Sequence, residues 1–227
     1  MTPPAPRLER LLRSARWGLS RDLDRRDLQP MLEHLLAAAP RGSEACLLAQ
    51  RNLARLLVTD QPFRAARLAC AALAVAEDAP TYAVLGIAHT LLGNYRCARR
   101  AYGRGLALDP GQLCCLHNLG HLLDVAFDRP AAALPYLRAA YLALPEEPEV
   151  AASFAHALGR AGDLEQARRL LRRAVGDADA KRLLAAWIGE EAQARPETGA
   201  ASASASTSEG TGRMPSPAPS PEPRAPH

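Results

Sequence analysis

Aromatic residues are scarce in this sequence. Phe, Trp and Tyr make up 4% of the 227 residues, although 48% of the chain is hydrophobic. The core must therefore be built mainly from Ala and Leu. These are among the best helix formers, whereas strands favour β-branched and aromatic residues. The composition favours an all-α protein.

Lysine and long apolar runs are also nearly absent. Lys181 is the only lysine among 28 basic residues, and the net charge is only +4. A charge this small for the length does not imply a nucleic-acid partner. The longest uncharged run, residues 79–95, is too short and too polar for an ordinary membrane span. Arginines interrupt the leucines near the N-terminus, so we expect neither a cleaved export signal nor a membrane partner.

Paired cysteine motifs are missing as well. The sequence has five cysteines and no C-x-x-C spacing among them: Cys46, Cys70, Cys97, Cys114 and Cys115. An odd number of scattered cysteines suits small buried side chains in a reducing compartment better than a disulfide framework. We therefore expect a cytoplasmic protein.

What the sequence does contain is an internal repeat. Gly86, Gly120 and Ala155 are separated by 34 and 35 residues. A series of alanines has spacings of 35 and 34 residues: Ala98, Ala133 and Ala167. A period in this range indicates stacked helical units.

This pattern resembles the tetratricopeptide repeat, a helix-turn-helix unit of about 34 residues. The resemblance covers residues 45–176 and implies a right-handed α-solenoid of antiparallel helix hairpins. The four expected repeats are residues 45–78, which are degenerate, followed by 79–112, 113–147 and 148–176.

The ends of the array need polar caps, because each hairpin buries its apolar face only against a neighbour. We expect capping helices in residues 7–44 and 177–195. Residues 1–6 and the Ala/Ser/Pro-rich tail 196–227 are expected to be disordered. The tail contains no Leu, Ile, Val, Phe, Tyr or Trp to bury.

Glycine and proline account for the turns. Gly86 and Gly120 are expected where the two helices of a hairpin approach closely. Gly93-Asn94 and Gly162-Asp163 are expected to end one helix and begin the next through left-handed or capping conformations. Residues 124–130 replace the short glycine turn in the third repeat, which predicts a longer bend and a helix that restarts at Pro130.

The resemblance implies that the first helix of each pair lines a concave groove. Placing the sequence on this scheme gives twelve candidate partner-binding residues: Arg51, Arg55, Ala83, Ile87, Thr90, Cys114, His117, His121, Asp124, Glu149, His156 and Arg160. Most arginines fall on the second helices and are expected on the convex, solvated side.

One subgroup of the family binds a partner's C-terminal carboxylate with Lys, Asn and Arg at set groove positions. Only Asn118 matches that set here, while Ala83 and Ile87 occupy the earlier positions and Glu149 and Ser153 the later ones. We therefore do not expect a carboxylate clamp.

Histidine forms the one unusual cluster. His117 and His121 are four residues apart, so they share a helix face, and His156 holds the place of His121 in the next repeat. Three imidazoles are a possible zinc ligand set. Without dedicated cysteine pairs the signal is weak, so contact with a partner is the favoured interpretation and no metal or cofactor is expected.

Catalytic motifs are absent. The sequence has no phosphate-binding P-loop, no dinucleotide fingerprint, no nucleophile elbow and no H-E-x-x-H motif. We expect a non-enzymatic scaffold or adaptor that binds a peptide or helix of another protein in the groove. Two alternatives stay open: a client-specific chaperone of a secretion or assembly system, and an accessory subunit with a metal site at His117, His121 and His156.

Overall fold

The computed structural model describes residues 6–194, without the side chains of Leu184 and residues 188–194. The chain divides into two units, Met1–Ile188 and Gly189–His227. The disorder expected for residues 1–6 and 196–227 lies outside the described residues, except at Pro6, which begins the first helix.

Every regular element in residues 6–194 is helical, as the composition and the repeat predict. The elements are α1 (Pro6–Ser20), α2 (Arg25–Ala38), α3 (Glu44–Leu57), α4 (Pro62–Leu73), α5 (Ala79–Leu91), α6 (Tyr95–Leu108), α7 (Leu113–His121), the π-helix η1 (Leu122–Ala126), α8 (Pro130–Ala143), α9 (Pro148–Arg160), α10 (Leu164–Val175) and α11 (Asp177–Ala194).

Proline lies in the first turn of five of these helices, where its missing N–H costs no hydrogen bond. These prolines are Pro6, Pro62, Pro80, Pro130 and Pro148. Gly93 and Gly162 adopt φ values of 71° and 98°, so both supply the expected left-handed turn. The side chain of Asp163 caps α10, whereas Asn94 precedes α6 without making a side-chain capping bond.

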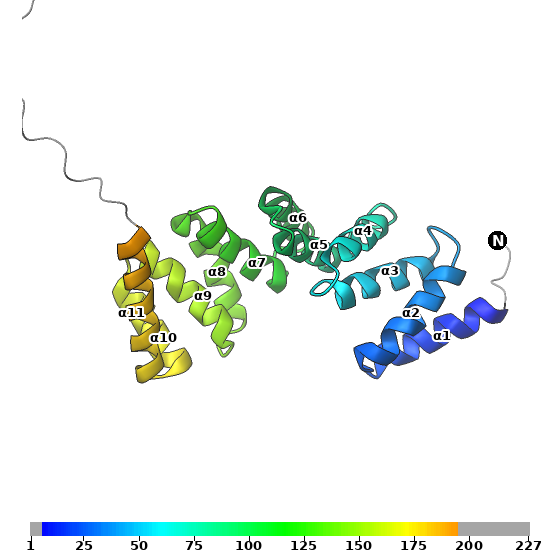
Figure 1. Ribbon diagram of the computed structural model, residues 1–227, viewed down its shortest axis with the longest axis horizontal. Coiled ribbons are helices and arrows are strands. Elements are labelled where there is room, and N and C mark those ends of the chain that lie inside the picture. The colour runs from blue at the N-terminus through cyan, green and yellow to red at the C-terminus, as the bar shows by residue number, and fades with distance from the viewer. Residues whose placement is uncertain (1–5, 195–227) are drawn as a thin grey trace, which may run out of the picture. The chain divides into compact units, whose positions relative to one another are not determined.

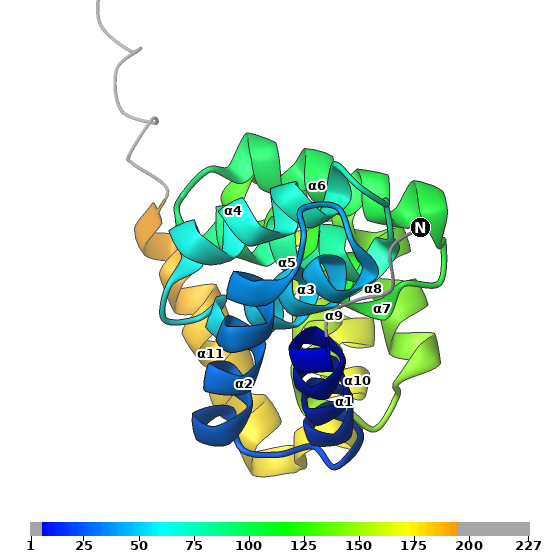
Figure 2. The same cartoon turned by 90° about the vertical axis from the view of Figure 1, so that its right-hand side faces the viewer.

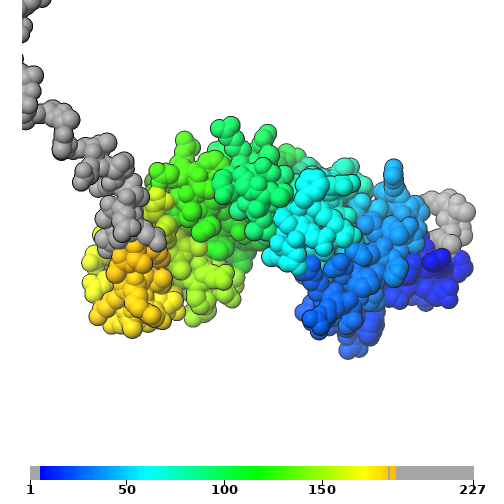
Figure 3. All heavy atoms as spheres, viewed as in Figure 1, coloured from blue at the N-terminus to red at the C-terminus, as the bar shows by residue number. Residues whose placement is uncertain are grey.

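The helices pack in chain order, as Figure 1 shows. From α1 to α10, each helix contacts the next, and the first helices α3, α5, α7 and α9 also contact one another in turn. This is an α-solenoid of antiparallel helix hairpins. In the space-filling view of Figure 3, neighbouring colours touch, because each unit packs on the units next to it in sequence.

The N-terminal helices extend this row, because α2 stacks on α3. Leu28, Leu32 and Leu35 of α2 belong to one buried cluster with Leu53 and Leu57 of α3. A second buried cluster runs from α5 to α11.

Close helix approach inside the hairpins follows the expected glycines. A Cβ atom on Gly86 would lie 2.2 Å from the ring of Tyr102, and one on Gly120 would lie 2.5 Å from Leu137. Tyr102 and Leu137 each lie four residues after a fully buried alanine, Ala98 and Ala133. The glycine therefore makes room for a large side chain one turn beyond the alanine that the sequence pattern singled out.

The third hairpin departs from the others where the sequence predicts a longer bend. The chain leaves α7 through the π-helix η1, Asp128 takes a positive φ of 53°, and α8 restarts at Pro130. Single-turn π-helices often occur at functional positions, because they shift the side chains that follow.

The five cysteines are free. Cys46 and Cys115 are buried as expected, whereas Cys70 is exposed, so it is not a core side chain. Among residues 6–194, no helix combines the length and apolar character needed to cross a membrane.

Gly86→Ala is expected to lower the free energy of unfolding by about 1–3 kcal/mol, because the new methyl group would overlap the buried ring of Tyr102. Urea denaturation followed by circular dichroism measures the change. The control is Gly103→Ala in α6, where a Cβ would meet nothing within 4 Å. It should leave stability unchanged or raise it by up to about 1 kcal/mol. Equal losses in the two variants would contradict this account.

Candidate partner-binding surface

The successive first helices α3, α5, α7 and α9 contact one another in turn. In Figure 2, the second helices α4 and α6 lie above the first helices α3 and α5. Arg55, Ile87 and His121 hold equivalent positions on α3, α5 and α7, and all three are at least partly exposed. Equivalent positions on packed, repeated helices share one side of the array. We call Arg55, Ile87, Cys114, His117, His121, Glu149 and Ser153 the first-helix surface.

Two histidines dominate this surface on α7. The ring centroids of His117 and His121 are 6.5 Å apart, and Nε2 of His117 lies 3.0 Å from Oγ of Ser153 on α9. His121 is exposed, whereas His117 is half-buried. Burial lowers the pKa of His117, and neighbouring His121 lowers it further, while Glu149 partly opposes the shift. His117 is therefore a neutral hydrogen-bonding group at neutral pH.

Asp124 lies below this surface and joins η1 to α9. Its side chain is 1% exposed, and Oδ2 accepts a hydrogen bond of 2.5 Å from Nδ1 of His156. Arg160 donates to the Asp124 backbone oxygen at 2.6 Å and to Oδ1 at 3.0 Å, and it also pairs with Asp128. Trp187 of α11 packs edge-on against the His156 ring, with centroids 4.9 Å apart.

The polar groups of this network bind one another inside the protein, which gives the network a structural role. A buried carboxylate is stable only when charged and hydrogen-bonding partners satisfy it, and Asp124 has His156 and Arg160. Together they fix the irregular turn of the third hairpin against α9. Three predicted partner-binding residues, Asp124, His156 and Arg160, thus bind one another.

Several other predicted positions also have structural roles. Ala83 is 3% exposed and lies in the core, so its placement on the partner surface was wrong. Arg51 forms an ion pair with Asp78 at 2.6 Å and donates to the Ala76 oxygen at 3.0 Å. The Thr90 hydroxyl donates to the Gly86 oxygen at 3.0 Å and lies 3.2 Å from the Tyr102 hydroxyl.

The three histidines do not converge on a common point. His117 forms a hydrogen bond with Ser153 and lies beside His121, whereas His156 forms one with Asp124. In the part of the chain that the structure describes, no group of three or more His, Cys, Asp or Glu side chains is placed to hold a metal ion.

Ser153 and His117 have the spacing of a nucleophile and its base, and Glu149 lies close enough to influence the imidazole. Acyl transfer also needs donors aimed at an oxyanion. Ser153 lies in the middle of α9, where backbone N–H groups are used within the helix. The pair of Ser153 and His117 therefore has no oxyanion donors from the middle of α9.

Comparison with known proteins identifies the architecture. MamA matches with a TM-score of 0.59 and 16% identity over 74% of this chain and 96% of its own. YrrB, described as a TPR protein with an unusual peptide-binding site, matches with a TM-score of 0.59 and 14% identity, over 79% of this chain and 90% of its own. PilF of Pseudomonas aeruginosa matches with a TM-score of 0.61 and 20% identity, over 82% of this chain and 86% of its own. The chain has the tetratricopeptide-repeat fold. No protein-family model and no curated protein matches the sequence.

The Asp124 network predicts that removal of one buried charge strongly lowers the stability of this tetratricopeptide-repeat fold. Asp124→Asn keeps the side-chain shape but leaves His156 and Arg160 without the buried carboxylate, so the free energy of unfolding should fall by about 3–5 kcal/mol. Urea denaturation followed by circular dichroism tests this.

The matched control is Asp128→Asn, which removes the other carboxylate that pairs with Arg160. Asp128 is 81% exposed, so its loss should cost about 1 kcal/mol or less. If both variants lost the same stability, Asp124 would not be the centre of the network.

Zinc is not expected to bind stoichiometrically, because Asp124 and Ser153 hold two of the three imidazoles apart. Protein purified without a histidine tag should contain far less than one equivalent by plasma mass spectrometry. One tightly bound equivalent that disappears in His117→Ala would support the metal-site alternative instead.

Proposed function

We propose that this protein is a non-enzymatic scaffold whose first-helix surface binds a peptide or helix of another protein. The observation that carries the proposal is the row of equivalent, accessible positions Arg55, Ile87 and His121 on three adjacent first helices. A cation, an aliphatic side chain and an imidazole in line suit a partner segment that presents both polar and apolar groups.

The chemistry of α7 and α9 supports hydrogen bonding as the main polar contribution. His117 is neutral at neutral pH because of its lowered pKa, and Ser153 lies beside it. Glu149 and His121 are exposed on the neighbouring helices. Neutral donors and acceptors at a partly buried site favour a partner backbone or side-chain amide over a strongly charged group.

A carboxylate clamp is not part of the proposal. The Asn118 amide, the one residue that matches such a clamp, donates to the Cys114 oxygen at 2.8 Å within its own helix. The partner is therefore proposed to bind through the middle of a peptide segment instead of a free C-terminus. The likeness to YrrB, described as having a peptide-binding site, agrees with a peptide partner. Five free cysteines favour a reducing compartment such as the cytoplasm.

Site-specific photo-crosslinking in the native host tests this surface. A photoreactive amino acid at His121 should crosslink a partner, whereas the same amino acid at Arg168, exposed on the second helix α10, should not. Mass spectrometry then identifies the product. Several partners would indicate a scaffold, and a single exported client would indicate the chaperone alternative.

Mutation supplies the control for this experiment. His121→Ala should weaken the captured complex about tenfold, as expected for one contact of moderate strength, without a change in melting temperature. Equal crosslinking from both positions, or none from His121, would contradict the proposal.

A further inference from the structure

Large apolar side chains are exposed at the turns that join the two helices of successive hairpins. Phe63 at the start of α4 is 67% exposed, and Tyr95 at the start of α6 is 43% exposed beside Leu92. Phe127 follows η1 in the next hairpin. Turns of successive antiparallel hairpins lie on one edge of a solenoid. We call Phe63, Leu92, Tyr95 and Phe127 the turn edge.

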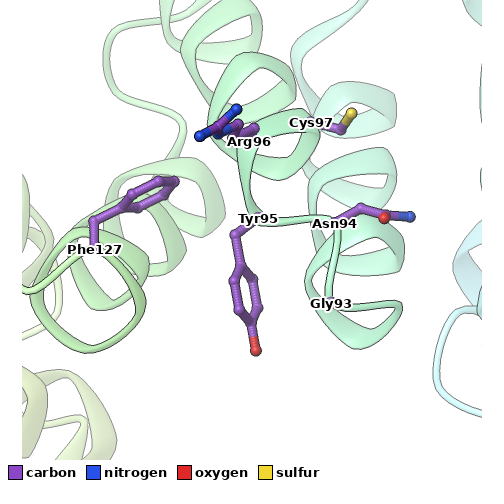
Figure 4. Close-up of a pocket in the computed structure, with 6 residues that line it drawn as sticks. All are labelled: Gly93, Asn94, Tyr95, Arg96, Cys97 and Phe127. Carbon is purple, nitrogen blue, oxygen red and sulfur yellow. The ribbon is translucent and has the colours of Figure 1, made fainter.

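Two neighbouring pockets connect these side chains. One, of about 300 Å³, lies between α4 and the end of α5, and it is lined by Phe63, Ala66, Arg67, Cys70, His89, Leu92 and Asn94. The other, of about 380 Å³, lies between the α5–α6 turn and Phe127 (Figure 4). Asn94 lines both pockets, so they adjoin. Volumes of this size admit large side chains of a partner.

Arginines surround the two pockets. Arg67 lines the first pocket and Arg96 the second, and Figure 4 shows the Arg96 side chain pointing toward the Phe127 ring. The guanidinium of Arg99 lies over the same ring, 5.4 Å from its centroid. None of these three arginines forms an ion pair with any residue in the described range 6–194.

Acidic side chains are few around the turn edge, and each of them is paired. Between Gln61 and Leu108 the only carboxylates are those of Glu77 and Asp78. Asp60 and Asp128, beside the first and third turns, pair with Arg25 and Arg160. Glu77 pairs with Arg104 and Asp78 with Arg51. The unpaired guanidiniums therefore leave a positive potential around apolar pockets, and a partner of opposite charge complements it.

We propose that the turn edge binds an acidic peptide segment of another protein, whose large apolar side chains enter the two pockets. Guanidinium groups bind carboxylates with two parallel hydrogen bonds, and Arg and Tyr are among the residue types enriched at the energetic hot spots of protein interfaces. This surface shares no residue with the first-helix surface, so the two sites are independent.

The geometry favours a peptide over single-stranded nucleic acid. Bases stack on successive open aromatic faces, and Arg99 already covers a face of Phe127, so only Phe63 and Tyr95 are exposed rings of the turn edge. The pocket beside Phe63 is mainly apolar, and burial lowers the pKa of His89, so that imidazole adds no positive charge at neutral pH. An apolar side chain fits such a pocket better than a phosphate does.

Selection from a phage-displayed library of random peptides tests the proposal on the full chain. Enriched peptides should be acidic, contain large apolar residues and bind more weakly as salt is raised. Tyr95→Ala and Arg96→Glu should each weaken them about tenfold or more. These side chains are exposed, so melting temperatures should stay close to that of the wild type.

Matched controls lie elsewhere on the chain. Leu142→Ala removes a large apolar side chain that is 69% exposed at the end of α8, and Arg168→Glu reverses an exposed charge on α10. Neither should change binding of the enriched peptides.

Three outcomes would overturn the proposal. One is the absence of enriched acidic peptides, and another is enriched peptides that tolerate Tyr95→Ala and Arg96→Glu. The third is binding of single-stranded DNA oligonucleotides in place of peptides, lost in the same variants. Peptides that lose affinity in His121→Ala instead would support the first-helix surface and contradict the turn edge.

Discussion

Close contact between the two helices of each hairpin is the constraint on which the rest of this structure depends. Gly86 and Gly120 leave the space that Tyr102 and Leu137 fill, and both large side chains are fully buried. This contact fixes the distance between the two helices and the rotation of the second helix about its own axis. Because every hairpin also stacks on the next, the same contact sets which residues of the first helices stay accessible and where the turns project.

The third hairpin keeps this close contact through Gly120 and Leu137, but its chain turns by a different route. It has no glycine turn, and η1 carries the chain out of α7 before α8 begins at Pro130. The π-helix turns the carboxylate of Asp124 inward, where it needs partners, and α9 of the next hairpin provides them in His156 and Arg160. An irregular turn thus becomes a fixed joint between two hairpins instead of a flexible loop.

The sequence predicted the fold well because its signals are local and repeated. Glycine, proline and alanine at a spacing of 34 or 35 residues specify the helices, their turns and their order. The candidate site was predicted less well. Periodicity shows on which face of a helix a residue lies, but it does not show how deeply neighbouring helices bury that residue. Ala83 lies on the expected helix yet is buried by its neighbours, and Arg51 is held by Asp78 from a later segment. Such long-range contacts leave no mark in a single sequence.

The turn edge escaped prediction for a related reason. Phe63 and Tyr95 are 32 residues apart and hold the same place in their repeats, but Phe127 has no such equivalent. An alignment of repeats also does not show that these side chains line adjoining pockets, whereas the folded turns do. Their arginine neighbours were assigned to a solvated convex face on the same alignment. The two surfaces that result differ in chemistry: imidazole and hydroxyl groups on the first helices, and guanidinium groups around apolar pockets at the turns. Since each selects a different kind of peptide, one array of hairpins has the means to hold two unlike segments at once, which is what a scaffold requires.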